Sequence, residues 1–476
     1  MNTQMTKLLT VAAAILICRT SAVCTAAETT RTVVVDPAKK HQTIEGWGVS
    51  LCWWANMAGR WPEAKMQSVV SLLTDETDGL GYNIFRYNIG GGDKPGHDHM
   101  EQRARIEGYK ASATAAYDWT ADASQRRVLK AILERRPKAI LEAFSNSPPW
   151  WMTTSRCAAG GRNGRPNLRN DQYEPFADYL TDVVKHFRDK LKINFRTLEP
   201  LNEPGAWWWK ENGRQEGCRF TPDQQAKILK LTAAALMRKG LRTRVSGTDE
   251  NSIKEGAKTI GGFDAATLKV LSQLNVHSYH GKEHRKQFAA LARKLGKRVW
   301  MSEGGPLKCP VRGRWRQCLW MAQVVIGDLR DLKAEAWIDW QAIDVRTWGV
   351  LNPDWKNKSF KISKRFYSHA HLARFIRPGY RIIDSNDAAT LAAICPGSRR
   401  LIVVAVNEGE KKTIRLDISR FGRGNYAATV YTTTSDKNLQ RKTARGRAGI
   451  LDLNMPNQSI ITVEVLPKNA YKDSRK

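Results

Sequence analysis

The stretches FRTLEPLNEP at residues 195–204 and RVWMSEGGP at residues 298–306 decide the fold. Each begins as an apolar β-strand and ends in a turn rich in proline or glycine, with Glu203 or Glu303 at the junction. Barrels of alternating strands and helices place catalytic side chains at this point, at the carboxyl ends of their strands. Hydrolysis of a glycosidic bond needs a pair of such carboxylates, whereas a single glutamate in a surface loop indicates nothing. We therefore expect Glu203 and Glu303 to be catalytic.

The same strand-then-helix alternation continues on both sides of these stretches. The expected strands lie within residues 43–50, 83–91, 138–151, 197–203, 244–250, 275–281, 298–305 and 334–344. Helical spacing of apolar residues lies between them, as in the segment 173–191, and Thr221-Pro222 begins a helix with a cap and a first-turn proline. Eight such units predict an α/β fold, a closed (β/α)8 TIM barrel. An open doubly wound sheet is the alternative, but the chain has no GxGxxG turn.

Beyond Pro378 the pattern changes to short β-rich runs separated by turns, without helical periodicity. This pattern predicts a small appended β-sandwich. The strand VVVD at 33–36 has no place in the barrel, so we expect it to pair with the sandwich. The expected parts are listed in chain order: a signal peptide at 1–27, an N-terminal strand at 28–42, a catalytic barrel at 43–377, a C-terminal sandwich at 378–467 and a basic tail at 468–476.

The first 27 residues have the pattern of a secretory signal, with Lys7 before a short apolar run and small residues at 25–27. We therefore expect secretion into the extracellular space or the periplasm. Six cysteines follow the expected cleavage site, and an even number in an oxidising compartment permits disulfides. Cys309 with Cys318, and Cys157 with Cys218, are the pairs we expect, although six cysteines allow fifteen pairings.

Composition narrows the function further. The 476-residue chain has a formal net charge of +31, but its basic residues are scattered and no nucleic-acid recognition motif is present. No segment is long and apolar enough for a membrane span. No CxxC spacing is present, and the one His-x-x-His spacing, at 277–280, does not by itself indicate a metal, so we expect no metal and no cofactor. Seven of the seventeen tryptophans fall in three clusters, at 53–54, 150–151 and 207–209, and such flat aromatic surfaces suit sugar rings. We expect a monomer that binds a polysaccharide or oligosaccharide.

Seven motifs, each at a strand end, resemble glycoside hydrolase family 30 in sequence and order. They are GWG (46–48), FRYNIGGGD (85–93), SNSPPWWM (145–152), LNEP (201–204), HSYH (277–280), MSEGG (301–305) and WIDW (337–340). GWGVSLCWWAN together with SNSPPWWM is most similar to the endo-β-1,6-galactanase-like branch, and the likeness to glucosylceramidases is weaker. The resemblance implies a retaining β-glycosidase with a (β/α)8 barrel and a β-sandwich.

The resemblance also implies roles for individual residues. Glu203 is expected to be the general acid/base and Glu303 the nucleophile, and a retaining mechanism needs their carboxyl groups about 5–5.5 Å apart. Because the nucleophile must be ionised, Arg86 is expected to be the cation that keeps Glu303 charged, with a salt bridge inside the barrel of no catalytic effect as the alternative, and Tyr279 is expected to donate a hydrogen bond to Glu303. The remaining expected substrate contacts are Asp93, Asn146, Trp151, Asn202 and Trp340. His277 and His280 carry weaker signals, and we expect both to be neutral.

Several alternatives remain open at this point. The same residues would serve a β-1,6-glucanase, a xylanase, an exo-acting β-glycosidase or a transglycosylase. A non-catalytic sugar-binding protein would need the tryptophans but not the two glutamates. The excess positive charge indicates either a generally basic surface or attraction to an acidic polysaccharide, for which the arginines at 156, 162, 165 and 169 form a cluster after the third strand.

Overall fold

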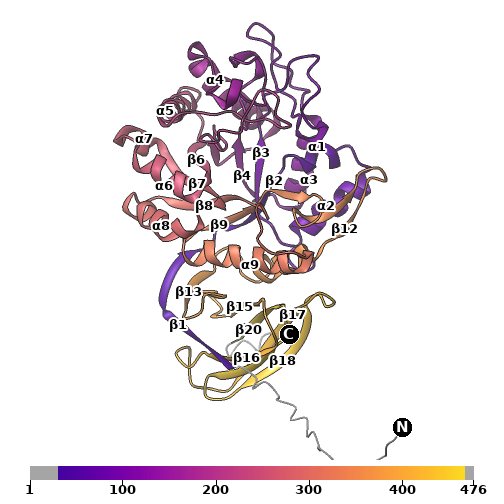
Figure 1. The fold of residues 1–476 in the computed structure, drawn as a ribbon, viewed down its shortest axis with the longest axis vertical. Helices are drawn as coiled ribbons and strands as arrows, with labels where there is room; N and C mark the ends of the chain where they lie inside the picture. Colours follow the sequence, from indigo (N-terminus) through magenta and orange to yellow (C-terminus); the bar gives the residue numbers. More distant parts are fainter. Residues whose placement is uncertain (1–29, 467–476) are drawn as a thin grey trace, which may run out of the picture.

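A computed structural model describes residues 30–466 of the chain. The molecule has two parts, a barrel wrapped in helices and a smaller all-β part, with helix α9 (Arg314–Arg330) lying between them (Figure 1). This is the predicted fold, a TIM barrel with an appended β-sandwich.

Eight parallel strands close the barrel, each paired with its neighbours in sequence order. They are β2 (Gly46–Ser50), β3 (Ile84–Asn88), β4 (Ile140–Phe144), β5 (Thr197–Glu199), β6 (Arg244–Ser252), β7 (Leu271–His280), β8 (Arg298–Gly304) and β9 (Ala336–Asp339). Closure comes from the pairing of β2 with β9, in which Gly46 opposes Ala336 and Val49 opposes Asp339. The predicted barrel is confirmed, strand by strand.

Helices cover the outside of the barrel (Figure 1). They are α2 (Glu63–Thr74), α3 (Ala123–Arg135), α4 (Tyr173–His186), α5 (Pro222–Arg238), α6 (Ile253–Gly261), α8 (Arg285–Lys294), α9 and α10 (Lys364–Ala373), with the shorter α1 (Trp54–Ala58) and α7 (Ala265–Val270). Helix α4 buries Phe176, Leu180 and Val183 at helical spacing. Helix α5 begins as predicted, because Thr221 caps it by accepting a hydrogen bond from the Gln224 backbone, with Pro222 in the first turn.

Short elements fill the loops at the barrel mouth. A three-stranded sheet follows the last barrel strand, made of β10 (Gln341–Ile343), β11 (Gly349–Asp354) and β12 (Ser359–Ile362). It was not predicted: the expected last strand, 334–344, is instead divided between β9 and β10. The single-turn helices are η1 (Gln102–Ala104), η2 (Trp150–Met152), η3 (Arg162–Gly164), η4 (Asn170–Gln172), the π-turn η5 (Phe187–Leu191) and η6 (Lys282–His284).

Nine strands form the sandwich. They are β1 (Thr30–Thr43), β13 (Arg381–Ser385), β14 (Thr390–Ile394), β15 (Leu401–Asn407), β16 (Lys412–Asp417), β17 (Tyr426–Thr433), β18 (Gln440–Gly446), β19 (Ile450–Met455) and β20 (Ser459–Val465). The N-terminal β1 pairs with β13 on one side and with β16 on the other. Val33, Leu416 and Val463 share one buried core, separate from that of the barrel. Strands β13, β18 and β19 were not among the predicted β-rich runs, and β18 gives no apolar signal because it is an edge strand whose side chains are mostly exposed and polar.

The contact between the two parts is made by polar groups as well as apolar ones. The indole of Trp315 on α9 donates to the Gln458 carbonyl at 2.6 Å. On α10 the buried His371 ring lies between the hydroxyls of Thr462 and Thr433, at 2.7 and 2.8 Å. These contacts hold the sandwich against the side of the barrel, away from the mouth.

The expected disulfides are absent. All six cysteines within residues 30–466 are free thiols, so the predicted Cys309–Cys318 and Cys157–Cys218 pairs are wrong. Cys318 is buried in the barrel core on α9, and the Cys157 thiol faces His99 and the Glu211 carbonyl instead of Cys218. Among the described residues, no helix combines the length and the apolar character that crossing a membrane requires. The predicted signal peptide and basic tail lie outside the described residues.

Candidate active site

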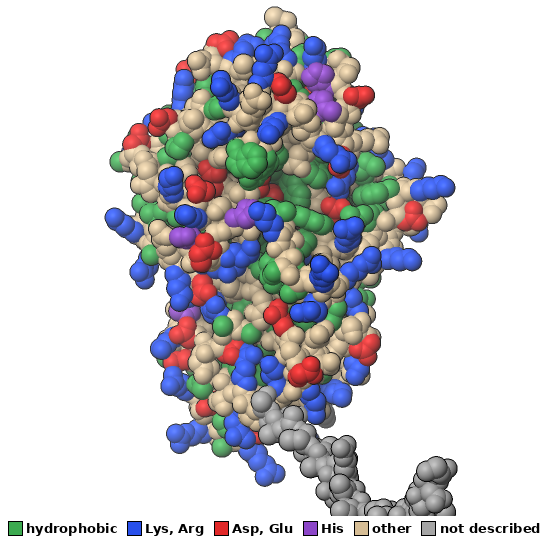
Figure 2. Space-filling model, viewed as in Figure 1, with side chains coloured by type: hydrophobic (Ala, Val, Ile, Leu, Met, Phe, Trp, Pro, Cys, Tyr) green, Lys and Arg blue, Asp and Glu red, His purple; other side chains and the backbone are tan. Residues whose placement is uncertain are grey.

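A cavity of about 910 Å³ lies at the carboxyl ends of the barrel strands. It is visible as a hollow in the barrel half of the molecule, with apolar side chains inside and Lys and Arg side chains on the rim (Figure 2). Asn202 and Glu203 follow β5, Tyr279 and Glu303 end β7 and β8, and Trp340 directly follows β9. Five of the predicted site residues therefore line one cavity.

The two predicted catalytic carboxylates face each other across this cavity. One oxygen of Glu203 and one of Glu303 lie within 4.8 Å of each other, and both side chains are almost fully buried. Glu203 has a left-handed backbone, with φ at 45°, a conformation that costs a non-glycine residue free energy. Its own N–H donates to the Asp249 carbonyl at 2.9 Å, and its carbonyl accepts from the Trp209 indole at 3.0 Å. These contacts hold the strained residue in place.

A buried charge network lies beneath Glu303. The Arg86 guanidinium on β3 donates to Glu142 at 3.0 Å, pairs with Asp249 and lies 3.6 Å from Glu303 Oε2. Burial favours the neutral acid at Asp249, but Arg86 and then His277 outweigh it and lower the pKa of Asp249 to about 2. The Arg86 cation is thus shared between Glu142, Asp249 and the predicted nucleophile Glu303.

His277 lies between the two glutamates. Its Nδ1 is 3.3 Å from Glu203 and 3.7 Å from Glu303, and its Nε2 is 3.1 Å from Asp249. Burial lowers the pKa of an imidazole, but the Glu303 and Asp249 carboxylates overcome that effect and raise the pKa of His277 to about 10. The two carboxylates thus favour the protonated ring, in contrast to the neutral His277 that we expected. For His280 burial and Lys308 lower the pKa, in keeping with the neutral form.

Glu303 has a second direct partner in Tyr279, whose hydroxyl donates to Glu303 Oε1 at 2.9 Å. Burial, followed by the Glu303 charge, raises the pKa of Tyr279 well above its usual range, so the phenol remains a donor. The pKa of Glu303 is raised to about 7, and burial is the largest cause. The charge of Glu203 also raises this pKa, whereas His277 and Arg86 partly offset the rise. Two carboxylates this close resist losing both protons, an arrangement that suits one acid and one base.

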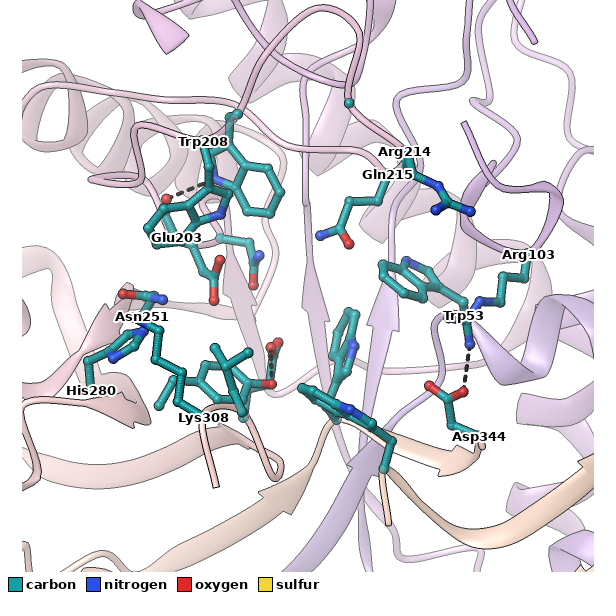
Figure 3. Close-up of a pocket in the computed structure, with 18 of the residues that line it drawn as sticks. Trp53, Arg103, Glu203, Trp208, Arg214, Gln215, Asn251, His280, Lys308 and Asp344 are labelled. Atoms are coloured by element: carbon teal, nitrogen blue, oxygen red, sulfur yellow. Dashed lines mark hydrogen bonds and ion pairs between the residues drawn. The ribbon is translucent and has the colours of Figure 1, made fainter. Parts of the chain in front are cut away.

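Tryptophans form much of the cavity wall. Those that line it are Trp53, Trp207, Trp208, Trp209, Trp340 and Trp348. Trp53 and Trp340 meet edge to face, with ring centroids 5.2 Å apart. Glu203 and Trp208 stand on one side of the cavity, opposite Trp53 and Arg103 on the other (Figure 3). Aromatic faces on opposite walls with carboxylates between them fit a sugar chain.

Four predicted site residues do not line the cavity. Arg86 is buried beneath it and reaches it only through Glu303. The Trp151 indole donates to the Lys110 carbonyl at 2.8 Å within the core, and Asn146 is buried beside Cys52. Asp93 turns away toward His97, in the loop between β3 and α3.

Other residues of the cavity escaped the sequence analysis. They are Arg103, Arg214, Gln215, Asn251, Lys308 and Asp344. Arg103 donates to Asp344 at 2.9 Å, and its guanidinium stacks over the Trp53 ring, 5.0 Å from the centroid. Arg214, Gln215, Lys308 and Asp344 come from loops and Arg103 from the single-turn helix η1, so no periodic signal marks these five. Asn251 could have been found from its place near the carboxyl end of a strand.

Comparisons with known proteins agree with this geometry. The family model described as O-Glycosyl hydrolase family 30 matches residues 30–258. The chain is 32% identical to an endo-beta-1,6-galactanase of Hypocrea rufa, over 84% of this chain and 86% of that protein. It is 23% identical to an exo-beta-1,6-galactobiohydrolase of Bifidobacterium longum, over 83% of this chain and 36% of that protein. A solved structure of a conserved exported protein from Bacteroides fragilis has the same fold, with a TM-score of 0.80 at 21% identity, covering 91% of this chain and all of that one. With a relative this similar over most of its length, the chain belongs to glycoside hydrolase family 30 and is an O-glycoside hydrolase.

Proposed function

We propose that this enzyme is a retaining endo-β-glycosidase that cuts β-1,6-linked galactan, with Glu203 as acid/base and Glu303 as nucleophile. The observation that carries the proposal is the approach of the two carboxylates to within 4.8 Å. Retaining enzymes hold their carboxyl groups about 5–5.5 Å apart, whereas inverting enzymes leave about 6.5–9.5 Å for a water molecule.

The reaction then proceeds in two displacements. Glu303 attacks the anomeric carbon, the bond to the leaving oxygen breaks, and Glu203 gives its proton to that oxygen. In the second step Glu203 removes a proton from water, the water oxygen attacks the same carbon, and Glu303 leaves as a carboxylate. His277 and Tyr279 stabilise the negative charge on Glu303 before the first step and after the second.

Asn202 is proposed to bind the sugar beside the broken bond. Its side chain lines the cavity, and its Oδ1 is buried and makes no hydrogen bond within residues 30–466. A buried acceptor without a partner is costly, so a sugar hydroxyl would satisfy it. Hydrogen bonds to the 2-hydroxyl strengthen in the transition state of such reactions.

The galactan specificity rests on the two relatives named for β-1,6-galactan chemistry. Endo action rests on the tryptophans that line both walls, which suit several sugar units. The test is a screen of β-1,6-galactan, β-1,6-glucan and glucuronoxylan oligosaccharides with the products sized. We expect internal cuts in the galactan. Preference for another polymer would refute the substrate, and release of monosaccharide alone would refute endo action.

The catalytic roles have a separate test. Glu303→Ala should abolish turnover, and added azide should then give a glycosyl azide of inverted, α configuration. Glu203→Ala should still react with substrates that have good leaving groups, and azide should release the β-azide. Ordinary activity in both variants would overturn the assignment. The first product of the wild-type enzyme should have the β configuration by proton NMR, since an α product would mean inversion.

We further propose that the enzyme is exported and that its substrate is acidic. Export rests on the signal pattern of residues 1–27, and N-terminal sequencing of protein from the culture medium should begin near Glu28. An intact N-terminus on protein retained in the cells would refute it. The acidic substrate rests on the basic side chains of Arg103, Arg214 and Lys308 in the cavity lining. None of the arginines at 156, 162, 165 and 169 lines the cavity, so the predicted cluster could act on an acidic chain only from outside it.

A further inference from the structure

Four potential metal ligands meet beside the active-site cavity, in a cluster that the catalytic mechanism does not use. Asp93, His97 and His99 come from the loop between β3 and α3, and Cys157 comes from the loop between β4 and α4. Each side chain offers one ligand atom, and the four atoms lie within 4.8 Å of one another. We propose that Asp93, His97, His99 and Cys157 bind a zinc ion that braces the wall of the active site.

The distances inside the cluster suit tetrahedral coordination. Zinc binds nitrogen and oxygen at about 2.0 Å and sulfur at about 2.3 Å, so ligand atoms of a tetrahedron are about 3.3–3.5 Å apart. His97 Nδ1 lies 3.2 Å from Asp93 Oδ1, and His99 Nε2 lies 3.6 Å from Cys157 Sγ. Both pairs are already at the separation that a shared ion requires.

Asp93 supplies an independent sign of a missing partner. Its side chain is 9% exposed, and Oδ1 accepts from the Lys94 backbone at 2.8 Å. The other oxygen, Oδ2, is buried and has no hydrogen bond within the described chain. A buried carboxylate oxygen that loses its water without gaining a donor is costly, and a bound cation would remove that cost. This also explains why Asp93 turns away from the sugar cavity.

Hydrogen bonds with the surrounding backbone orient the side chains of His99 and Cys157. His99 Nδ1 must be the donor in its 2.7 Å contact with the Gly213 carbonyl, because a carbonyl only accepts. Its Nε2 therefore carries the lone pair, and this nitrogen faces Cys157. A backbone carbonyl that accepts from the other ring nitrogen commonly orients a zinc-bound histidine. The Ala159 backbone N–H donates to Cys157 Sγ at 3.3 Å, but burial raises the pKa of this thiol to about 11, so zinc binding must displace the thiol proton.

The ligand types select the metal. Thiolate and imidazole together favour zinc over calcium or magnesium, which prefer oxygen. Four protein ligands leave no open position, as in structural rather than catalytic zinc sites. The ion would join two barrel loops, and through the Gly213 contact it would also support the loop after β5. That loop carries Arg214 and Gln215 into the cavity (Figure 3).

The test measures metal binding directly and needs no substrate. The full chain, stripped with a chelator, is titrated with Zn²⁺ by calorimetry and with Co²⁺ by absorption spectroscopy. We expect one equivalent of each, and a cobalt spectrum with the charge-transfer band of a thiolate ligand. Cys157→Ser should abolish that band, and His99→Ala should weaken zinc binding at least tenfold. Cys395→Ser, which changes a partly exposed thiol in the sandwich, is the matched control and should bind like the wild type.

Two results would overturn the proposal. One is a wild-type protein that takes up no zinc, or binds cobalt without a thiolate band, and this result is independent of whether any variant folds. The other is a folded Cys157→Ser and a folded His99→Ala that bind zinc as tightly as the wild type, which would mean adventitious surface binding. Thermal unfolding gives a second measurement, because a given zinc concentration should raise the Tm of the wild type and of Cys395→Ser more than that of His99→Ala.

Discussion

The hydrogen bond from Tyr279 to Glu303 offers the sharpest test of the charge arrangement in the active site. Tyr279→Phe removes one hydroxyl from a buried position and leaves the ring in place. The bond is 2.9 Å long and its acceptor is a carboxylate, so it favours the ionised form of Glu303. A hydrogen bond to a charged group contributes about 1.5–3 kcal/mol, and one pKa unit corresponds to about 1.4 kcal/mol. Its loss should raise the pKa of Glu303 by about 1–2 units.

The consequence is a shift of the pH profile toward alkaline pH. The nucleophile must be ionised, so kcat/KM should fall as the pH drops through the pKa of Glu303, which is about 7 in the wild type. In Tyr279→Phe the acid limb should move to roughly pH 8–9, and at about pH 6 kcat/KM should be roughly ten- to a hundredfold lower than in the wild type. The assay is kcat/KM against pH on the preferred oligosaccharide.

Tyr117→Phe is the matched control for this experiment. Its hydroxyl also donates to a carboxylate, Asp182, at 2.9 Å, but it does not line the cavity. The control should keep the acid limb of the wild type. An acid limb that stays in place in Tyr279→Phe, with the variant folded and active, would refute the role of this bond in setting the ionisation of Glu303.

Three further predictions concern stability, subsites and charge. Arg86→Met should lower the free energy of unfolding by about 3–5 kcal/mol in urea titrations, because Glu142 and Asp249 lose their buried cation; an unchanged midpoint would contradict this. Trp207→Ala removes a 63% exposed ring at the cavity and should weaken binding of long oligosaccharides about two- to tenfold by calorimetry, with Tm unchanged. Equal affinity would mean that the ring binds no sugar. Because Arg214 lies in the cavity lining, kcat/KM on an acidic galactan should fall steeply with salt, whereas a neutral short oligosaccharide should show little change. An equal response of both substrates would leave only a generally basic surface.

The barrel was predictable because its signals are local and repeated. Buried strands such as 140–144 and 298–304 read as apolar runs, and helices such as α4 show their buried face at helical spacing. Edge strand β18 and the small sheet β10–β12 lack such signals. Their residues are set by exposure or by loop packing, and neither is periodic in the sequence.

The sequence alone determined which residues at the strand ends meet at the mouth of the barrel. The carboxyl ends of parallel barrel strands share one face, so the motifs ending near Glu203, Tyr279 and Glu303 had to converge once the fold was recognised. Their neighbours along the chain then identified the family.

Only the tertiary structure decided how the loops and the buried charges arrange themselves. It placed the His277 ring between two glutamates, and it brought Cys157 to His99 and Asp93 rather than to Cys218. The physical reason is that a loop has no repeating hydrogen-bond pattern, so its path follows from packing against other loops. The pKa values depend likewise on burial and on charges distant in sequence, which become neighbours only when the barrel closes.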